Sequence, residues 1–312
     1  MRPFLIVNPA SAGGRTGRHF DRIARAVRAS HGEFRAVFTT RRGEATDIAR
    51  DAARGGERMV VAVGGDGTAS EVVDGLAGAG RVVDPELLFG CIPHGTGGDL
   101  RRSLGWPGLP EEAARALAVG ITVTCDLGFV TYTAHDGSTQ ARHFVNVSSF
   151  GVSGCVVREL QRSGRLLGGK LTYTLASAKA LFRYRDQPVR WRADGGDWVE
   201  EPITAMAICN GRFFGAGMMV APAARMDDGL LDLTVWKGLG FADFLTKRRM
   251  LYDGSHVKLP NTRCHQLRTM EAEPLEGVEV LLDVDGEQPG RLPARWTVVP
   301  GALRVRVPLT RP

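Results

Sequence analysis

Two signatures of small disulfide-rich and zinc-binding proteins are missing from this sequence. Its five cysteines stand far apart, and no two of them form a CxxC pair. Without such pairs, a disulfide scaffold and a zinc ribbon are both excluded as explanations of the fold. Proteins that keep scattered, unpaired cysteines are typical of a reducing compartment, which here predicts the cytosol.

Long hydrophobic segments are also missing. No stretch approaches the roughly 18 apolar residues that a membrane-spanning helix needs. The apolar run Phe4–Val7 ends at Asn8-Pro9 and is too short for the core of a signal peptide. We therefore expect a soluble, cytoplasmic protein that meets a membrane only transiently and only at its surface.

Lysine is scarce, although the chain is basic. Arginine supplies most of the 40 basic residues, which outnumber 34 acidic ones and give a net charge of +6. The lysines are Lys170, Lys179, Lys237, Lys247 and Lys258. A positive charge suits nucleic acid, an anionic membrane or a phosphorylated ligand. The basic residues are scattered, however, and no basic stripe with interleaved aromatic residues indicates a nucleic-acid binder.

A length of 312 residues and 43% apolar composition predict a folded protein of about two domains. In the first half, apolar strand-like runs (3–7, 34–39, 59–63, 87–92) alternate with helical patterns (17–29, 44–54, 68–76). This alternation is typical of βαβ units around a mainly parallel sheet.

The pattern changes after about residue 126. Strand-like runs occur at 129–134, 143–149, 189–192, 203–209, 230–236, 278–284 and 295–299, with Asp-Gly turn signals among them. Helical patterns at 156–162, 170–184 and 241–251 interrupt this series, and a last strand is expected at 303–308. The second half therefore predicts antiparallel β structure with a helical insertion.

Three glycine-rich loops follow predicted strands of the first half. They are Asn8–Gly14, Gly64–Thr68 and Pro93–Asp99. Loops at the carboxyl edge of a parallel sheet bind ligands in open α/β folds, and glycine allows the backbone to approach a phosphate. Plain strand-to-helix turns are the alternative for any single loop, but three on one edge favour phosphate binding. Neither the dinucleotide fingerprint nor the P-loop pattern fits these loops.

Two of the loops carry an acid, Asp66 and Asp99, which would repel a bound phosphate. A divalent cation between carboxylate and phosphate removes that repulsion. The loops thus indicate phosphoryl transfer from a nucleotide–Mg²⁺ complex. Asp285 and Glu287 lie at another Asp-Gly turn, where one acid would accept a proton from an acceptor hydroxyl; a simple hairpin turn is the alternative.

An ordered series of motifs resembles the diacylglycerol kinase catalytic-domain family, and within it the bacterial lipid kinases related to sphingosine and ceramide kinases. The series is Val7-Asn8-Pro9, Gly64-Gly65-Asp66-Gly67-Thr68 with Glu71, Pro93-His94-Gly95-Thr96-Gly97-Gly98-Asp99, Asp126-Leu127-Gly128, Gly169-Lys170-Leu171-x-Tyr173, Ala221-Pro222, Asp228-Gly229-Leu230-Leu231-Asp232 and Asp283-Val284-Asp285-Gly286-Glu287. It covers most of the chain.

The resemblance implies two domains. Residues 1–126, completed by about 300–312, would form an α/β nucleotide-binding domain like those of NAD kinase and phosphofructokinase. Residues 127–299 would form an antiparallel β-sandwich with a helical insertion that helps to hold the lipid.

The resemblance also implies roles for single residues. ATP would be contacted by Asn8, Pro9, Ala10, Ser11, Ala12, Gly13, Gly14, Thr40, Gly64, Gly65, Asp66, Gly67, Thr68, Ala69, Ser70 and Thr96. Catalytic Mg²⁺ would be surrounded by Asp66, Asp99 and Glu287. Asp285 would be the general base, and Asp126, Lys170, Arg15 and Arg18 would form a charged network.

A separate structural Mg²⁺ would use the Asp228 carboxylate and the carbonyls of Arg225 and Leu230. Three positions depart from the family pattern. Ser70 and Gly98 stand where Asn is common, and His94 stands where Leu is usual. Gly98 removes a hydrogen-bonding side chain, whereas His94 is either a loop histidine with satisfied hydrogen bonds or a phosphate contact.

The sequence therefore predicts an ATP- and Mg²⁺-dependent kinase that phosphorylates a lipid hydroxyl, with diacylglycerol as the default acceptor. Its partner would be a neutral membrane lipid, reached by peripheral contact with the membrane surface, and a homodimer stays open. One alternative is a kinase for a soluble acceptor, as in NAD kinases and phosphofructokinases. A second is a non-catalytic nucleotide- or lipid-binding module.

Overall fold

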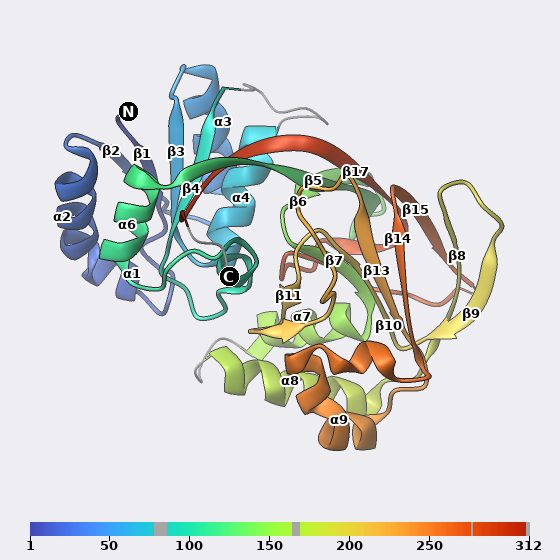
Figure 1. Ribbon diagram of the computed structural model, residues 1–312. Helices are drawn as coiled ribbons and strands as arrows, with labels where there is room; N and C mark the ends of the chain where they lie inside the picture. The colour runs from blue at the N-terminus through green and yellow to red at the C-terminus, as the bar shows by residue number, and fades with distance from the viewer. Residues whose placement is uncertain (78–85, 164–168, 276, 310–312) are drawn as a thin grey trace. The chain divides into compact units, whose positions relative to one another are not determined.

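The computed structural model describes residues 1–77, 86–163, 169–275 and 277–309. The chain divides into two compact units. The first consists of Met1–Leu127 with Pro300–Pro312, and the second of Gly128–Val299. The predicted fold class is confirmed, because the first unit is α/β and the second contains two packed β-sheets covered by helices (Figure 1).

A parallel sheet forms the centre of the first unit. Its strands follow the order β2 (Arg35–Phe38), β1 (Phe4–Val7), β3 (Met59–Gly64) and β4 (Leu88–Pro93). All six residues of β3 are buried, as expected for a strand that is covered on both faces. The end of β17 (Gly290–Val307) pairs in parallel with β4, with Arg304 opposite Leu88. The last strand of the chain thus adds to this sheet.

Helices cover both faces of the parallel sheet. Ile23 of α2 (Phe20–His31) and Leu117 of α6 (Pro110–Val119) pack on the strand residues Leu5 and Val61. Figure 1 shows α3 (Glu44–Arg54) and α4 (Asp66–Ala77) on the opposite face. The remaining helices of this unit are the short α1 (Arg15–Arg18) and α5 (Asp99–Leu104). The sequence did not predict α5 and α6.

The second unit contains an antiparallel five-stranded sheet. Its order is β14 (Thr262–Leu267), β13 (Leu231–Trp236), β10 (Ala205–Cys209), β7 (Val147–Gly151) and β16 (Leu282–Val284). The strands of the other sheet follow the order β6 (Thr139–Phe144), β5 (Ile121–Ala134), β17, β15 (Thr269–Pro274), β8 (Gln187–Ala193) and β9 (Val199–Ile203). Phe150 of β7 stacks on Trp296 of β17 with ring centroids 5.4 Å apart, and both side chains are fully buried.

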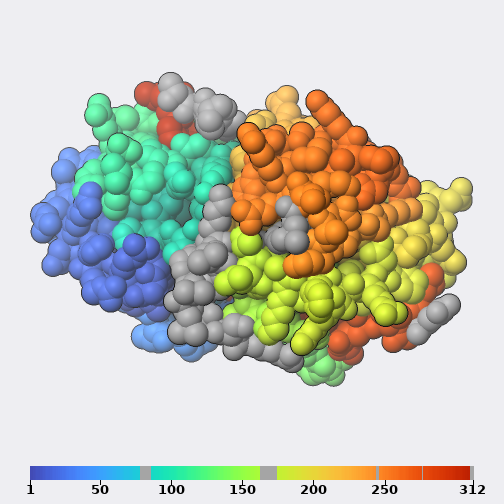
Figure 2. Space-filling view, turned by 90° about the horizontal axis from the view of Figure 1, so that it is seen from below, coloured from blue at the N-terminus to red at the C-terminus, as the bar shows by residue number. Residues whose placement is uncertain are grey.

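The outer face of the five-stranded sheet is covered by helices. Along β10, Met206 and Ile208 point into the sandwich core, whereas Ala205 and Cys209 belong to a separate cluster on the other face. The helices on that side are α7 (Val152–Ser163), α8 (Gly169–Arg183) and α9 (Phe241–Asp253). Their yellow-green and orange surfaces adjoin one another in Figure 2. A short hairpin also belongs to this layer, and each of its strands, β11 (Phe213–Phe214) and β12 (Met218–Met219), has two residues. The 3-10 helix Ser255–Lys258 completes the layer.

Several strands differ from the sequence prediction. The separate strands expected at 295–299 and 303–308 are parts of one strand, β17, in which Gly301 has a φ of 60°. The sequence analysis did not predict β9, β14 and β15, because these short strands contain few apolar residues. Four consecutive residues of β14 are exposed, so no apolar pattern marks it. None of the helices that the structure describes has the length and hydropathy of a membrane span.

Candidate functional site

The three glycine-rich loops meet at the carboxyl ends of β1, β3 and β4. Asn8 donates its backbone N–H to the carbonyl of Val63 at 3.0 Å and its side-chain amide to Thr68 Oγ1 at 3.1 Å. Ser11 Oγ donates to the carbonyl of His94 at 3.3 Å. The first loop is therefore hydrogen-bonded to both of the others. These bonds bring most of the predicted ATP-contacting residues to one edge of the sheet.

Close backbone contact explains two of the glycines. A Cβ atom at Gly95 would lie 2.4 Å from the Cα of Gly65, closer than real Cβ atoms approach other atoms. The carbonyl of Gly64 accepts a hydrogen bond from the N–H of His94 at 2.6 Å in the same region. The contact between the loops requires these glycines, whether or not a phosphate binds. The sequence analysis had favoured phosphate approach as the reason for these glycines, with plain strand-to-helix turns as the alternative.

His94 is engaged within the loops. Its Nδ1 lies 2.9 Å from the hydroxyl of Thr16, and its ring makes an edge contact with His19. Burial lowers the pKa of His94, and the neighbouring His19 and Arg15 lower it further. A neutral ring that is hydrogen-bonded to Thr16 favours the loop histidine over the phosphate contact among the two alternatives.

The carboxylate of Asp66 accepts three backbone hydrogen bonds from the third loop. Gly98 and Asp99 donate to Oδ2 at 2.7 and 3.1 Å, and Leu100 donates to Oδ1 at 3.2 Å. Asp66 thereby fixes the loop after β4 to the start of α4. A carboxylate has about four lone-pair positions, so one position is left on Oδ1 for a cation.

Asp99 and Asp126 are buried and also bind neighbouring groups. Asp99 pairs with Arg102 at 3.1 Å, and the same Arg102 nitrogen donates to the carbonyl of Gly97 at 2.6 Å. Asp126 accepts the N–H of Gly301 at 2.7 Å, where β17 bends. The two acids thus bind different parts of the first unit. The role of Asp99 beside Mg²⁺ and that of Asp126 in a charged network stay predictions.

The backbone accounts for Gly98 in place of the usual Asn. Gly98 precedes α5 with φ 71° and ψ 34°, which is the left-handed helical region. Glycine and asparagine are the residues that adopt this region most readily. Gly98 therefore preserves the backbone of the loop while the Asn side chain is lost.

The remaining predicted ATP residues take ordinary local roles. Thr40 is exposed, and its hydroxyl donates to Glu44 at 2.9 Å. Ser70 is buried in α4, and Thr96 is exposed in the third loop. Arg15 and Arg18, which were predicted for the charged network, are exposed and donate to the carbonyls of Ala12 and Gly13 in the first loop. Positive φ values at Ala12, Gly13 and Gly14 shape that loop.

In the second unit, Asp285 and Glu287 lie on a tight turn. Asp285 and Gly286 have φ values of 49° and 84°, as a two-residue Asp-Gly hairpin turn requires, so this turn exists as the sequence predicted. Asp285 Oδ2 accepts the N–H of Val145 at 2.9 Å, while Oδ1 accepts those of Asn146 and Val147 at 3.1 and 3.0 Å. The Asp285 carboxylate is thus fixed at the start of β7.

Two neighbours of the turn complete the arrangement. Glu287 pairs with Arg142 at 2.8 Å, and both side chains are mostly buried. Asp283, which the sequence analysis named in a motif but gave no role, accepts the N–H of Gly286 at 2.8 Å and the hydroxyl of Ser149 at 3.3 Å. Burial raises the pKa of Asp283 to about 7, with smaller contributions from Asp285 and Glu287. Its position two residues before Asp285 was the only available signal.

The predicted structural metal site lies in the turn before β13. Asp228 Oδ1 accepts the N–H of Leu230 at 3.1 Å, and Arg225 lies three residues earlier in the same loop. Asp232, which the sequence analysis left out of the site, is buried nearby. Its Oδ2 has no hydrogen-bond partner among the described residues. Burial raises the pKa of Asp232 to about 6, and Asp228 adds to the increase.

An unpartnered buried carboxylate oxygen beside a second carboxylate fits a bound cation, so the residues present suit Mg²⁺. Within the described ranges, however, no three His, Cys, Asp or Glu side chains gather closely enough to hold a metal by themselves. Carbonyls and water would have to complete the coordination. Lys170 is the second residue of α8, and its side chain lies outside the described part of the chain.

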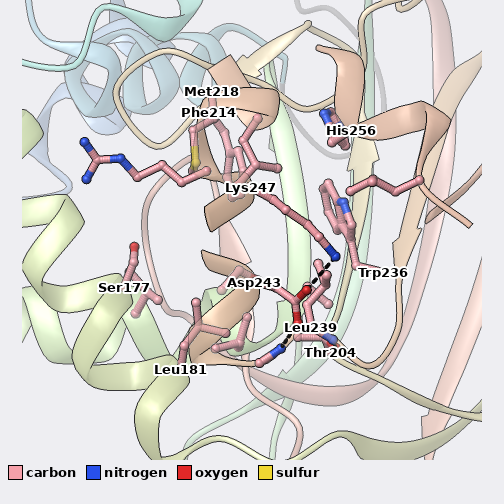
Figure 3. Close-up of a pocket in the computed structure, with 18 residues that line it drawn as sticks. Ser177, Leu181, Thr204, Phe214, Met218, Trp236, Leu239, Asp243, Lys247 and His256 are labelled. Carbon is pink, nitrogen blue, oxygen red and sulfur yellow. Dashed lines mark hydrogen bonds and ion pairs between the residues drawn. The ribbon is translucent and has the colours of Figure 1, made fainter. Parts of the chain in front are cut away.

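An apolar pocket of about 110 Å³ lies between the outer face of the five-stranded sheet and the helices. Ala205 and Trp236 of the sheet face Val156 of α7, Leu181 of α8 and Leu251 of α9 across it. Figure 3 shows its labelled lining residues pointing inward from the sheet and the helices.

The charged groups of the pocket wall are partly neutralised. Lys247 extends toward Asp243, which it meets at 2.6 Å, and Asp243 also accepts the N–H of Gly240 at 3.1 Å (Figure 3). Arg248, His256 and three hydroxyl residues also belong to the wall, but nearly all of the accessible surface inside the pocket is apolar. Such a pocket suits a hydrocarbon chain.

Two family models match this chain. The diacylglycerol kinase catalytic domain matches residues 2–130, and the YegS C-terminal NAD kinase beta sandwich-like domain matches residues 146–307. The chain belongs to the diacylglycerol kinase and YegS-like lipid kinase family. The resemblance seen in the motifs is thereby confirmed.

Individual relatives agree with this family membership. A diacylglycerol kinase of Mycobacterium tuberculosis is 32% identical over 81% of this chain and 78% of its own length. A probable YegS-like lipid kinase of Pseudomonas aeruginosa is 32% identical over 96% and 93%. The crystal structure of a putative diacylglycerol kinase from Bacillus anthracis str. Sterne has a TM-score of 0.77 at 22% identity, covering 98% of this chain and 95% of that one. That structural likeness supports the fold.

Mg²⁺ should stabilise the protein through the turn before β13. We expect added Mg²⁺ to raise the melting temperature by several degrees, because binding to the folded state alone stabilises it by mass action. Asp228→Asn and Asp232→Asn should each abolish the increase, whereas Asp227→Asn should keep it. Thermal melts with Mg²⁺ and with a chelator test this. If Mg²⁺ raises the melting temperature of Asp228→Asn and Asp232→Asn as much as that of the wild type, the ion does not bind at this turn.

Asp283 should make stability depend on pH. Its pKa rises from 3.8 to about 7 on folding, so the folded state binds the additional proton. The free energy of unfolding should therefore fall as pH rises from about 4 to about 7. Asp283→Asn should flatten this part of the curve, and exposed Asp197→Asn should not. Urea unfolding at several pH values measures the difference, and parallel curves for wild type and Asp283→Asn would contradict it.

Proposed function

We propose that this member of the lipid kinase family transfers the γ-phosphate of ATP, as its Mg²⁺ complex, to the hydroxyl of a neutral lipid. Diacylglycerol is the proposed acceptor and phosphatidic acid the product. The observation that carries the proposal is an apolar pocket along the same sheet that fixes Asp285. The relatives named diacylglycerol kinase support the choice of acceptor.

The pocket and Asp285 are connected through β7. The carboxylate of Asp285 binds the amides of Asn146 and Val147 at the start of this strand, and Asn146 donates its side-chain amide to the carbonyl of Phe213 at 2.5 Å. Phe214 then lines the pocket, which continues to Val152 just beyond the end of β7. Four residue steps along a strand span about 13 Å. An acyl chain in the pocket would thus place its polar end toward Asp285.

In the proposed reaction, the lipid hydroxyl oxygen forms a bond to the γ-phosphorus while the bond to the ADP oxygen breaks. Asp285 accepts the hydroxyl proton, and three backbone amides hold its carboxylate in place. Asp66 has one acceptor position left for Mg²⁺, and the family resemblance adds Asp99 and Glu287 as further acids for the ion. Mg²⁺ would neutralise charge that develops on the phosphates. The three loops of the first unit would contact ATP.

The cellular setting belongs to the same proposal. We place the protein in the cytoplasm, with transient contact to the membrane surface, because its acceptor resides in the bilayer. Arg248 supports this, since it lines the pocket and is exposed, and anionic headgroups attract such residues by about 1 kcal/mol each. Homodimer formation stays open. Gel filtration would measure the oligomeric state, and vesicle flotation would measure binding to the membrane surface.

The first experiment is transfer of labelled γ-phosphate from ATP and Mg²⁺ into diacylglycerol, monoacylglycerol, sphingosine and ceramide in mixed micelles. Sugar phosphates and NAD serve as soluble acceptors. We expect label in diacylglycerol. Label only in a soluble acceptor would replace the lipid assignment with the soluble-acceptor alternative. Nucleotide binding with no labelled product at all would favour a binding module.

Asp285→Asn should lower the rate about 10²–10⁴-fold, the range for loss of a general base, while ATP affinity stays near wild type. Asparagine can still accept backbone hydrogen bonds, but it cannot accept the proton. Asp136→Asn, at another hairpin turn of the same unit, is the matched control and should retain full activity. Single-turnover kinetics and calorimetric ATP binding provide the readouts. A near-normal rate in Asp285→Asn would contradict the role.

Ser177→Phe should fill the pocket and raise the KM for long-chain diacylglycerol about 10- to 100-fold. The expected effect follows from losing the burial of a few methylene groups, each worth about 0.8 kcal/mol. A water-soluble short-chain diacylglycerol should be affected much less. Ala178→Phe changes the next residue of α8, which does not line the pocket, and serves as the control. Equal effects on both chain lengths would mean that the pocket does not hold the chain.

A further inference from the structure

The guanidinium of Arg101 lies in a narrow slot between two glycines. A Cβ atom at Gly98 would be 3.1 Å from Arg101 Nε, and one at Gly108 would be 3.3 Å from Nη1. Both distances are tighter than ordinary carbon contacts. The guanidinium therefore has room in this position because neither neighbour carries a side chain.

Arg101 has no protein partner in the described part of the chain. Its side chain makes neither a hydrogen bond nor an ion pair there, although it is half-buried and carries five N–H donors. The next residue, Arg102, differs, because it pairs with Asp99 and donates to the carbonyl of Gly97. A partly desolvated cation without a counter-charge is unfavourable. Arg102 thus supports the loop, whereas Arg101 is available for a ligand.

Arg101 faces a cavity of about 160 Å³ at the carboxyl ends of β3 and β4. Gly64, Gly65 and Gly95 line this cavity, and its only charged lining groups in the described residues are Asp66 and Arg101. Asp66 already accepts three backbone hydrogen bonds. The Arg101 guanidinium is therefore the group in this cavity that is suited to bind an anion.

Arg101 lies beside a position where this chain departs from the family pattern. Asn is common at position 98 in that pattern, and the Cβ of such a residue would lie 3.1 Å from Arg101 Nε. In this chain, the guanidinium brings N–H donors to the place where an Asn amide would start. We propose that Arg101 binds a phosphate group in this cavity and takes over the hydrogen bonds lost with the Asn side chain. Gly98 makes the room for it.

The proposal rests on the proposed function only in requiring a phosphate-bearing substrate. A guanidinium binds phosphate oxygens through two parallel N–H bonds, whichever molecule carries the phosphate. Two sources share this chemistry: the phosphates of ATP and the phosphodiester headgroup of an anionic membrane lipid. The experiment is designed to separate the two sources.

The variants are Arg101→Ala and Arg101→Gln, compared with Arg115→Ala. Arg115 is exposed on α6 of the same unit and also has no hydrogen-bond partner there. Calorimetry measures ATP binding to the full chain, and flotation measures its binding to phosphatidylcholine vesicles with and without phosphatidylglycerol. Arg101→Gln guards against a folding defect, since it keeps most of the side-chain length without the charge.

We expect one of two patterns for Arg101→Ala and Arg101→Gln, each with Arg115→Ala like wild type. A rise of about 10- to 100-fold in the Kd for ATP assigns the contact to a nucleotide phosphate. An unchanged Kd for ATP with binding to phosphatidylglycerol vesicles weakened by a similar factor assigns it to a lipid phosphodiester. If neither quantity changes, Arg101 binds no phosphate and the proposal is wrong.

A double variant tests the link to Gly98. Gly98→Asn in the Arg101→Ala background should recover part of the lost affinity, because Asn tolerates the left-handed backbone and returns an amide donor. Failure to recover any affinity would overturn that link. Because ATP binding is measured without turnover, this test holds even if no lipid is phosphorylated. Failure of the lipid kinase proposal can thus be told apart from failure of the Arg101 proposal.

Discussion

Each unit contains a loop that depends on a carboxylate bound by three consecutive backbone amides. Asp66 accepts the N–H groups of residues 98–100, and Asp285 accepts those of residues 145–147. Hydrogen bonds to a charged group are about twice as strong as neutral ones, so shifting either carboxylate would cost several strong bonds at once. The acids that the family resemblance marks for chemistry therefore also hold together the loops around them. Replacing one of them changes local geometry as well as charge.

Glycine has a second purpose in the first unit besides approach to a phosphate. The loops after β3 and β4 touch backbone to backbone at Gly65 and Gly95, and the left-handed turn at Gly98 directs three amides toward Asp66. Gly98 and Gly108 also leave the slot that the Arg101 guanidinium occupies. A residue that departs from the usual pattern is thus connected to a second residue three positions later, and the two are best understood together.

In the second unit, the two faces of strand β10 carry side chains of different size, and the apolar pocket lies on the side of the smaller ones. The large side chains of Met206 and Ile208 on β10 pack in the sandwich core. The residues on the opposite face of this strand have small side chains: Ala205, Ala207 and Cys209. Ala205 lines the apolar pocket between this face and the helices, together with Trp236 of β13. Asp283 precedes the Asp285-Gly286 turn in the same sheet, and burial raises its pKa and so favours its neutral form. Apolar space and a rigid acidic turn are therefore products of a single sheet.

The sequence alone determined the α/β and β-sandwich classes, because buried parallel strands and Asp-Gly hairpins leave local patterns that survive in any tertiary setting. It also placed Asp66, Asp99, Asp285 and Glu287, since these lie in continuous motifs. Other features depend on residues far apart in the chain. The apolar pocket gathers residues from 152 to 259, and Asn146 meets the carbonyl of a residue 67 positions away. The strands β14 and β15, the buried oxygen of Asp232 and the slot around Arg101 likewise exist only after folding. Local periodicity records which face of an element is buried, but only tertiary packing decides what covers it.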